Sequence, residues 1–260
     1  MPDMTQPPTT RMPPLSQQWH DTEQGVSLVR SPLPARPITM QAQPECIELD
    51  LNRTQLVVVD MQNDFCHPQG WFGIQGVDIS PMRSPLTTLI PLVDRWRALG
   101  YPVLWLNWGI RPDCANLSPT QLHKGRRLPG GIGYGDALPG QDSRAVVAGD
   151  WGARNVDELP PREGDLLIHK HRLSGFWDSE LDSVLRQRGI TTLLFAGINT
   201  DRCVFSTLQD AAFLGYDCVL LEDACGTPSP QYVSDAIYFL VRQLHGFVGR
   251  ATHLLDACAP

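Results

Sequence analysis

Three side chains with complementary chemistry stand at or just past the ends of three apolar segments. Asp60 ends the segment TQLVVVD, Lys170 ends GDLLIHK, and Cys203 follows TTLLFAGI after a short polar turn. Because ligands of open α/β sheets bind beyond the carboxyl ends of the strands, we expect these side chains to meet at one edge of a sheet. A thiol, a carboxylate that takes its proton and a lysine that keeps the carboxylate ionised predict attack of sulfur on an amide carbonyl, followed by hydrolysis.

The turn before Cys203 has two expected roles. Unpaired N–H groups at a helix N-terminus favour negative charge, so we expect the helix that begins here to lower the pKa of the thiol. The same N–H groups predict a site for the oxyanion that develops during attack. Taken singly, each residue has a plainer interpretation: Cys203 as a small buried side chain, Asp60 as a helix cap or ion-pair partner, and Lys170 as a surface lysine. The prediction therefore depends on the three residues together.

The elements that would position these residues alternate along the chain. Short apolar runs predict strands, and apolar residues at helical spacing predict the helices between them. The expected strands cover 54–60, 101–108, 164–170, 191–198 and 217–224. Four helices are expected: from Leu86 to before Gly100, from Asp178 as N-cap to Gly189, over 203–214 and over 230–244. Pro91 lies inside the first of these patterns, so that helix is expected to start late or to be kinked. This alternation predicts an α/β fold with a parallel sheet covered on both faces.

Composition divides the chain into an arm and one domain. Residues 1–45 are rich in proline and poor in apolar clusters, which predicts an arm that is disordered or wraps a neighbouring subunit. Residues 46–260 are expected to form the domain. Within it, 109–150 is rich in Gly, Pro and Arg and has no clear period, which is typical of a lid or binding loop.

The bulk composition excludes several classes of function. Of 260 residues, 42% are hydrophobic and 19% charged, which allows a packed core, and the net charge of −7 argues against a nucleic-acid or membrane-surface binder. No apolar run is long enough to cross a membrane, and we expect no signal peptide. Seven cysteines without a CxxC pair indicate neither a zinc knuckle nor a disulfide framework, so we expect a reducing, cytoplasmic location.

Three motifs together resemble the isochorismatase-like cysteine hydrolases. They are VVVDMQNDF, KHRLSGF and GINTDRCV, and the resemblance covers about residues 50–250. It implies a Rossmann-like three-layer sandwich with a mostly parallel sheet of about six strands and an Asp60–Lys170–Cys203 triad. It also implies a cis peptide bond between Ile198 and Asn199, an oxyanion hole formed by the N–H groups of Asn199 and Cys203, and a homodimer or homotetramer.

The chain departs from the motifs of some branches of this family, and these differences narrow the range of expected substrates. Isochorismatases proper lack the nucleophilic cysteine. Nicotinamidases carry metal-binding histidines after the second strand, where this chain reads NWGIRPDCANL, so we predict no metal and no other cofactor. The chain is similar to ureidoacrylate amidohydrolases in SGFWDSELDSVLRQRGITTLLFAGI and to biuret hydrolases, and by extension triuret hydrolases, in GIRPDCANL. The resemblance therefore implies hydrolysis of an amide bond in a small ureido compound.

Several further residues are candidates for binding such a planar, polar substrate. They are Phe65 as an aromatic wall, Asn107 and Arg111 as readers of carbonyl oxygens, Trp177 as a cover and Gln243 as a match to a biuret-hydrolase glutamine. Each has a plainer interpretation as a core, turn or surface residue. The basic residues His123, Lys124, Arg126 and Arg127 predict either recognition of an anionic ureide or a solvated loop.

Two other classes of function remain open from the sequence. The first is a non-catalytic binding protein that kept the fold. The second is a thiol redox enzyme; the absence of a CxxC motif argues against it, although Cys66 and Cys203 are expected near the same edge and a disulfide between them is conceivable.

Overall fold

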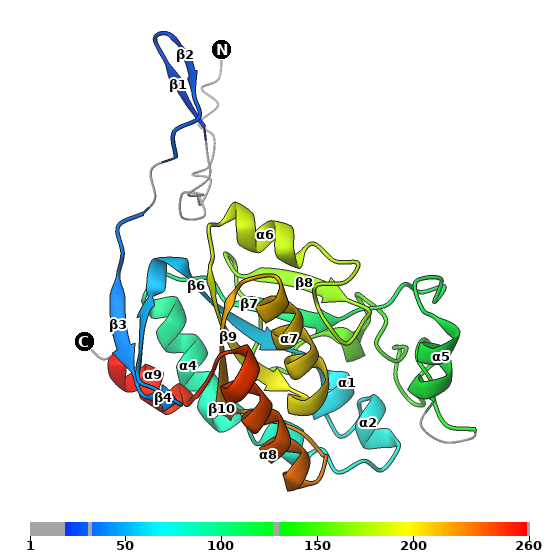
Figure 1. Ribbon diagram of the computed structural model, residues 1–260. Coiled ribbons are helices and arrows are strands. Elements are labelled where there is room, and N and C mark those ends of the chain that lie inside the picture. The colour runs from blue at the N-terminus through cyan, green and yellow to red at the C-terminus, as the bar shows by residue number, and fades with distance from the viewer. Residues whose placement is uncertain (1–18, 31–32, 127–129, 259–260) are drawn as a thin grey trace.

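A seven-stranded sheet forms the centre of the molecule in this computed structural model, which describes residues 19–30, 33–126 and 130–258 (Figure 1). The strand order is β4-β11-β10-β9-β6-β7-β8, and every neighbouring pair is parallel except β11 with β4. The strands are β4 (Ala42–Gln43), β6 (Thr54–Val59), β7 (Leu104–Trp108), β8 (Leu166–Lys170), β9 (Thr192–Ile198), β10 (Asp217–Gly226) and β11 (Phe247–Gly249). The predicted α/β fold with a mostly parallel sheet is confirmed.

The central strands β6 and β9 are buried along their whole length. Their sequences do not alternate between apolar and polar residues, as expected for parallel strands covered on both faces. At their carboxyl ends Val59 lies opposite Gly197. A Cβ atom at position 197, where φ is +106°, would lie 2.2 Å from the backbone oxygen of Val59. The two strands that lead to Asp60 and Cys203 can therefore approach closely because residue 197 is glycine.

Helices cover both faces of the sheet. On one face α4 (Leu86–Ala98) packs against α9 (Ala251–Ala257), and α7 (Phe205–Phe213) and α8 (Gln231–Leu240) lie on the other (Figure 1). Helix α4 begins at Leu86 although it contains Pro91, so the proline does not delay its start. The shorter α-helices are α1 (Asn63–Cys66), α2 (Trp71–Ile74), α3 (Ser80–Arg83), α5 (Pro119–Gly125) and α6 (Leu181–Gln187). Single turns of π-helix, called π-turns below, cover Thr200–Val204 and Val241–His245, and single 3-10 turns cover Leu51–Arg53 and Trp151–Ala153.

The expected N-cap role of Asp178 is wrong. Helix α6 begins at Leu181 with Glu180 in the N-cap position. Asp178 itself has φ of 55°, and its Oδ2 atom lies 3.1 Å from Nη2 of Arg172. The carboxylate therefore pairs with a cation of the preceding loop and does not satisfy the first turn of the helix.

The long segment 109–150 is fixed at several points. It contains α5, whose N-cap Ser118 forms a capping box with Gln121. Farther along, the carboxylate of Asp64 accepts a hydrogen bond of 2.7 Å from the N–H group of Val146. The Asp64 contact attaches the segment to α1, which follows β6 in the motif VVVDMQNDF.

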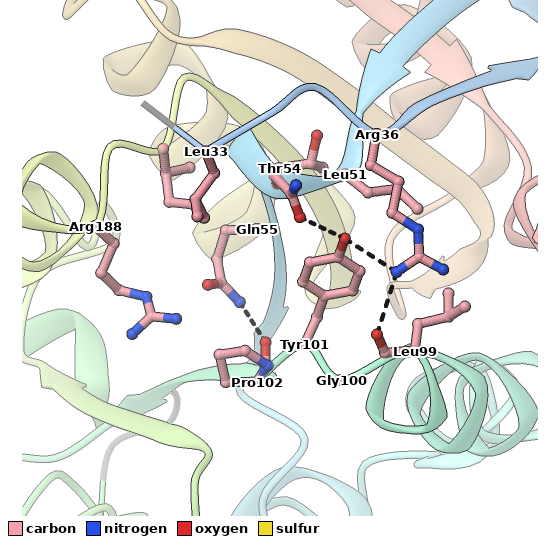
Figure 2. Close-up of a pocket in the computed structure, with 12 residues that line it drawn as sticks. Leu33, Arg36, Leu51, Thr54, Gln55, Leu99, Gly100, Tyr101, Pro102 and Arg188 are labelled. Atoms are coloured by element: carbon pink, nitrogen blue, oxygen red, sulfur yellow. Dashed lines mark hydrogen bonds between the residues drawn. The ribbon is translucent and has the colours of Figure 1, made fainter. Parts of the chain in front are cut away.

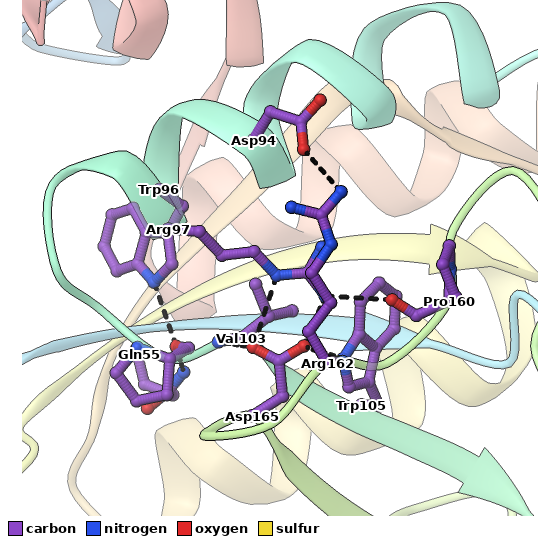
Figure 3. A network of polar contacts seen from close by, with 10 residues as sticks. Gln55, Asp94, Trp96, Arg97, Val103, Trp105, Pro160, Arg162 and Asp165 are labelled. Carbon is purple, nitrogen blue, oxygen red and sulfur yellow. Dashed lines mark hydrogen bonds and ion pairs between the residues drawn. The ribbon is translucent and has the colours of Figure 1, made fainter. Parts of the chain in front are cut away.

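A polar network at the amino edge of the sheet joins α4 to the neighbouring strands (Figure 3). Its centre is the carboxylate of Asp165, which forms an ion pair with Arg97 and accepts hydrogen bonds from Trp105 Nε1 at 2.9 Å and Val103 N at 3.1 Å. Burial alone would raise the pKa of Asp165, but Arg97 and the N–H donors hold it below its usual range. The negative charge of the Asp165 carboxylate is thus balanced by Arg97 and by N–H donors at the point where β7 and β8 begin.

The described part of the N-terminal region forms two pairs of strands. A hairpin of β1 (His20–Thr22) and β2 (Gly25–Ser27) stands away from the body (Figure 1), whereas β3 (Pro37–Met40) pairs with β5 (Ile47–Asp50). Strands β3 and β4 lie within residues assigned from composition to the arm, and they pack on the domain. Residues 1–18 lie outside the described residues. Among the described helices, none has the length and apolar character needed to span a membrane.

Candidate active site

Asp60, Lys170 and Cys203 meet at the carboxyl edge of the sheet. Asp60 directly follows β6, Lys170 is the last residue of β8, and Cys203 lies in the π-turn after β9. Lys170 Nζ lies 3.0 Å from Asp60 Oδ2, and the Cys203 side chain interacts with both residues. Their exposed fractions are 2%, 0% and 6%, in the order Asp60, Lys170, Cys203. The thiol, the carboxylate and the ammonium group thus form one buried cluster.

Trp108 supports this cluster from the intervening strand β7. Its backbone N–H group donates to Asp60 Oδ1 at 2.8 Å, and its ring lies 4.2 Å from Lys170 Nζ. A cation above an indole face is stabilised by the ring quadrupole. Trp108 therefore holds both members of the ion pair, a role that sequence reasoning missed even though Trp108 directly follows the candidate Asn107.

Gln62 fixes the backbone around the site. Its Nε2 atom donates to the carbonyl oxygens of Trp108 at 2.8 Å and Ala153 at 2.7 Å, and its Oε1 accepts from Trp108 N at 2.8 Å. Gln62 therefore joins the end of β7 to the segment after β6. The motif VVVDMQNDF contains this glutamine, but its contacts could not be inferred from spacing alone.

Burial dominates the electrostatics of the site. It raises the pKa of Asp60 and, together with the Asp60 carboxylate, raises that of the Cys203 thiol to about 12. Burial alone would lower the pKa of Lys170, but Asp60 and Cys203 hold it above its usual value. The expected lowering of the thiol pKa is therefore wrong, because a thiolate next to Asp60 would place two anions beside one cation. The resting thiol therefore keeps its proton at neutral pH.

The turn before Cys203 has the backbone that the family resemblance implied. The peptide bond between Ile198 and Asn199 is cis. The carbonyl oxygen of Asn199 accepts hydrogen bonds from the N–H groups of Arg202 at 3.0 Å and Val204 at 3.2 Å. The use of the Asn199 and Cys203 N–H groups as an oxyanion hole stays a prediction.

The candidate substrate-binding residues separate into buried and exposed groups. Phe65 is buried against Trp71 and Phe72, and Asn107 is buried with its Nδ2 atom 2.6 Å from Asn155 Oδ1. The other three candidates have exposed side chains, and contacts at the surface are found for two of them. Arg111 forms an ion pair with Asp113, Trp177 donates to Asp210, and Gln243 lies in the π-turn Val241–His245.

Among the described residues there is no disulfide and no group placed to hold a metal ion. All seven cysteines lie in the described part of the chain and are free. Burial raises the pKa of Cys66 to about 12, and its thiol points to the carbonyl oxygen of Met82. Within the described ranges there is no group of three or more His, Cys, Asp or Glu side chains placed to hold a metal ion. Of the basic loop residues, Arg127 lies outside the described residues, and His123 and Lys124 lie in the last turn of α5.

A protein-family model for the isochorismatase domain matches residues 54–251, which include the whole triad. The chain belongs to the isochorismatase family. Similar solved structures from this family include an isochorismatase family protein from Desulfovibrio vulgaris, with 29% identity and a TM-score of 0.64 over 80% of this chain and 99% of that one. N-carbamoylsarcosine amidase from Thermoplasma acidophilum has 27% identity and a TM-score of 0.57 over 76% and 96% of the two chains.

A more distant structure also shares the isochorismatase-family fold. It is a cysteine hydrolase from Pseudomonas syringae pv. phaseolicola, with 21% identity and a TM-score of 0.68 over 86% of this chain and 97% of that one. Because the sequences differ so much, this likeness supports the arrangement of the sheet and helices alone.

Proposed function

We propose that this isochorismatase-family protein is a cysteine amidohydrolase that cleaves a C–N bond of a small ureido compound without a metal. The supporting observation is the buried cluster in which one carboxylate contacts both a thiol and an ammonium group. Lys170 Nζ at 3.0 Å keeps a positive charge next to Asp60, so the carboxylate can act as a base despite its burial. A purely structural cysteine would not need two buried charges beside it.

The proposed reaction has two halves. Cys203 Sγ attacks the carbonyl carbon while its proton moves to Asp60, and the carbonyl oxygen becomes an oxyanion that the N–H groups of Asn199 and Cys203 would bind. Asp60 then returns the proton to the leaving nitrogen, the C–N bond breaks, and a thioester remains on Cys203. Water attacks the thioester with Asp60 as base, which releases the acid or carbamate and restores the thiol.

Two features support a ureido substrate. N-carbamoylsarcosine amidase, which is similar to this chain, carries in its name a substrate with a carbamoyl group on nitrogen. In addition, the neutral aromatic side chain of Trp108 lies against the triad, and Asn107 and Phe65 belong to the segments that carry Trp108 and Asp60; such groups suit a planar molecule with several N–H and C=O groups. We favour a compound of the biuret or triuret type, cleaved with release of ammonia or carbamate.

An anionic ureide such as ureidoacrylate is the second candidate. The observation that favours it is a set of basic side chains: His123 and Lys124 in the last turn of α5, and Arg126 just after it. The Arg126 Nη2 atom lies 3.9 Å from Asp136 Oδ2. If these residues recognise a carboxylate, replacing Lys124 and Arg126 with glutamine would raise KM for an acid and leave KM for a neutral ureide unchanged.

The test is ammonia release from biuret, triuret, ureidoacrylate, N-carbamoylsarcosine, nicotinamide and maleamate. We expect turnover of one ureido compound by the wild type and loss of at least about a thousandfold in Cys203→Ala, because the nucleophile is removed. Cys46→Ala removes an exposed thiol and serves as the matched control. Full ammonia release by Cys203→Ala would contradict the mechanism, and nicotinamide as the preferred compound would contradict the substrate class.

A further inference from the structure

The hydroxyl group of Thr207 joins two of the three motifs that carry the triad. Its Oγ1 atom donates a hydrogen bond to the carbonyl oxygen of Cys203 at 2.6 Å and accepts one from the N–H group of Gly175 at 3.1 Å. Thr207 lies on α7, four residues after Cys203, and Gly175 belongs to the motif KHRLSGF. The Thr207 side chain is fully buried, so bulk water does not compete for either bond.

The contact with Gly175 distinguishes Thr207 from an ordinary helical threonine. A threonine in a helix commonly donates to the carbonyl oxygen four residues earlier, and that bond alone is local. Here the same hydroxyl group also accepts from a backbone N–H group 32 residues away in the chain. A hydroxyl group that donates and accepts at once polarises both bonds, so together they form one bridge between two segments.

The loop that contains Gly175 also contacts the buried ammonium group. Lys170 Nζ lies 3.4 Å from the carbonyl oxygen of Arg172, three residues before Gly175. The loop after β8 is therefore bonded to Lys170 at one point and, through Thr207, to the backbone of Cys203 at another. This link matters because β8 and β9 are separated in the sheet by β6 and β7, so strand pairing does not join them directly.

The backbone around Cys203 has an uncommon geometry that contacts from outside hold in place. Cys203 lies in the π-turn Thr200–Val204. Turns of π-helix are rare and occur mostly at functional sites. Near the start of this turn, the Asp201 carboxylate accepts a hydrogen bond of 2.8 Å from the Ser229 hydroxyl group. Near its end, the bond from Thr207 holds the Cys203 carbonyl oxygen.

We propose that Thr207 is a positioning residue that holds the backbone of Cys203 where the thiol meets Asp60 and Lys170. A displacement of about 1 Å in a reacting group can reduce a rate on the order of a hundredfold. Thr207 contacts the Cys203 carbonyl oxygen and not its sulfur, so it acts through the position of the thiol. The kinetic part of this inference rests on the proposed amidohydrolase function, whereas the position of the thiol can be tested without a substrate.

The kinetic test compares Thr207→Val with Thr207→Ser. Valine keeps the shape of the side chain and removes the hydroxyl group, whereas serine keeps the hydroxyl group. For the ureido compound that the wild type hydrolyses, we expect Thr207→Val to lower kcat at least tenfold. KM should change less than twofold, because Thr207 is buried behind the turn and is not proposed to touch the substrate. Thr207→Ser should keep at least half of the wild-type kcat.

Alkylation of Cys203 tests the position of the thiol without a substrate. The protein is treated with iodoacetamide at pH 8.5, and mass spectrometry of the peptide that contains Cys203 gives the rate. The wild-type thiol should react slowly, because it is buried beside a carboxylate. A displaced turn would expose the thiol and separate it from Asp60, so Thr207→Val should react at least fivefold faster. Thr207→Ser should react at the wild-type rate.

Thr54→Val is the matched control. Thr54 is also buried, and its hydroxyl group also donates to the carbonyl oxygen four residues earlier, that of Asp50, at 2.7 Å. Figure 2 shows Thr54 beside a pocket at the amino edge of the sheet, at the opposite end of β6 from Asp60. Its kcat and its rate of Cys203 alkylation should equal those of the wild type.

The two measurements give separate answers. Alkylation of Thr207→Val at the wild-type rate would overturn the proposal, and so would equal changes in Thr207→Val and Thr54→Val, which would indicate a general loss of stability. If the wild type releases no ammonia from any compound, the proposed function fails and alkylation alone decides the role of Thr207. Thr207→Ala also lacks the hydroxyl group and replaces the valine variant if that protein does not fold. If neither variant folds, Thr207 is required for folding, and the positioning role is overturned.

Discussion

Lys170 is fully buried, and its ammonium group is balanced by one carboxylate. We expect Lys170→Met to abolish ammonia release and to lower the free energy of unfolding by about 3–5 kcal/mol, because it leaves the Asp60 carboxylate buried without a cation. Urea unfolding and the ammonia assay measure the two effects.

A double variant separates charge from packing at the same position. Asp60→Asn combined with Lys170→Met removes both charges, so it should recover much of the lost stability and stay inactive. A Lys170→Met protein as stable as the wild type would contradict the assigned ion pair, and retained activity would contradict the assigned mechanism.

Asp64 gives the stability of the protein a defined pH dependence. Burial raises the pKa of this carboxyl from 3.8 to about 6, with a small contribution from Asp150 and opposition from the N–H groups of Val146 and Trp71. Since the folded state holds the proton more tightly, the stabilisation is fully present below about pH 4 and is lost as pH rises through 6, a change of roughly 3 kcal/mol.

The variant Asp64→Asn tests this pH dependence, because the amide does not titrate. Urea unfolding at pH 4 and pH 7 should show that the wild type loses more stability over this interval than the variant does. Equal losses in the two proteins would contradict the raised pKa of Asp64.

The convergence of Asp60, Lys170 and Cys203 could be predicted from the sequence because the ends of parallel strands lie at one edge of the sheet. The electrostatic state of Cys203 could not be, because it depends on burial, and an exposed fraction of 6% is a property of the packed molecule. The supporting contacts of Trp108 were missed for a related reason: they join three strands, and their register is not visible in local spacing.

At the scale of elements, Gly197 controls how closely β9 approaches β6. We expect Gly197→Ala to destabilise the protein by at least about 3 kcal/mol and to reduce activity, because the added Cβ would meet the Val59 backbone oxygen at 2.2 Å. Gly215→Ala is the matched control, since Gly215 also has a positive φ, +91°, but no atom lies within 4 Å of its added Cβ. Its cost should be about 1 kcal/mol, from backbone strain alone. Thermal unfolding measures the loss of stability in the two variants. If the close approach of β9 to β6 had no effect, the two losses would be equal.

The sequence predicted the long elements and missed the short ones. The five expected strands correspond to β6, β7, β8, β9 and β10, because short apolar runs bounded by turn residues are a strong local signal. Strands β4 and β11 have two and three residues, too few to form a pattern. Helix α5 lies inside the expected loop, although its capping sequence SPTQ was a signal that could have located it.

At the scale of the whole molecule, we expect the β1–β2 hairpin to take part in an oligomer. Val26 and Val29 in and after β2 are 58% and 73% exposed, and a two-stranded hairpin alone is marginally stable in water. We expect the hairpin to contact a neighbouring subunit. Deletion of residues 1–30 should then reduce the number of subunits per particle, obtained from light scattering as particle mass divided by chain mass, whereas an unchanged number of subunits would contradict the contact. The deletion ends before β3, because Met40 is part of the core.

The burial of Cys203 also predicts how its thiol resists oxidation and alkylation. Peroxide and alkylating agents react with thiolates, and a thiol with a pKa of about 12 that is 6% exposed offers them very little. Cys46, on the surface, would be consumed first. On the proposed mechanism, Cys203 is protected from these reagents until a bound carbonyl makes transfer of its proton to Asp60 productive. A preparation whose surface thiols have been oxidised would therefore keep its catalytic capacity.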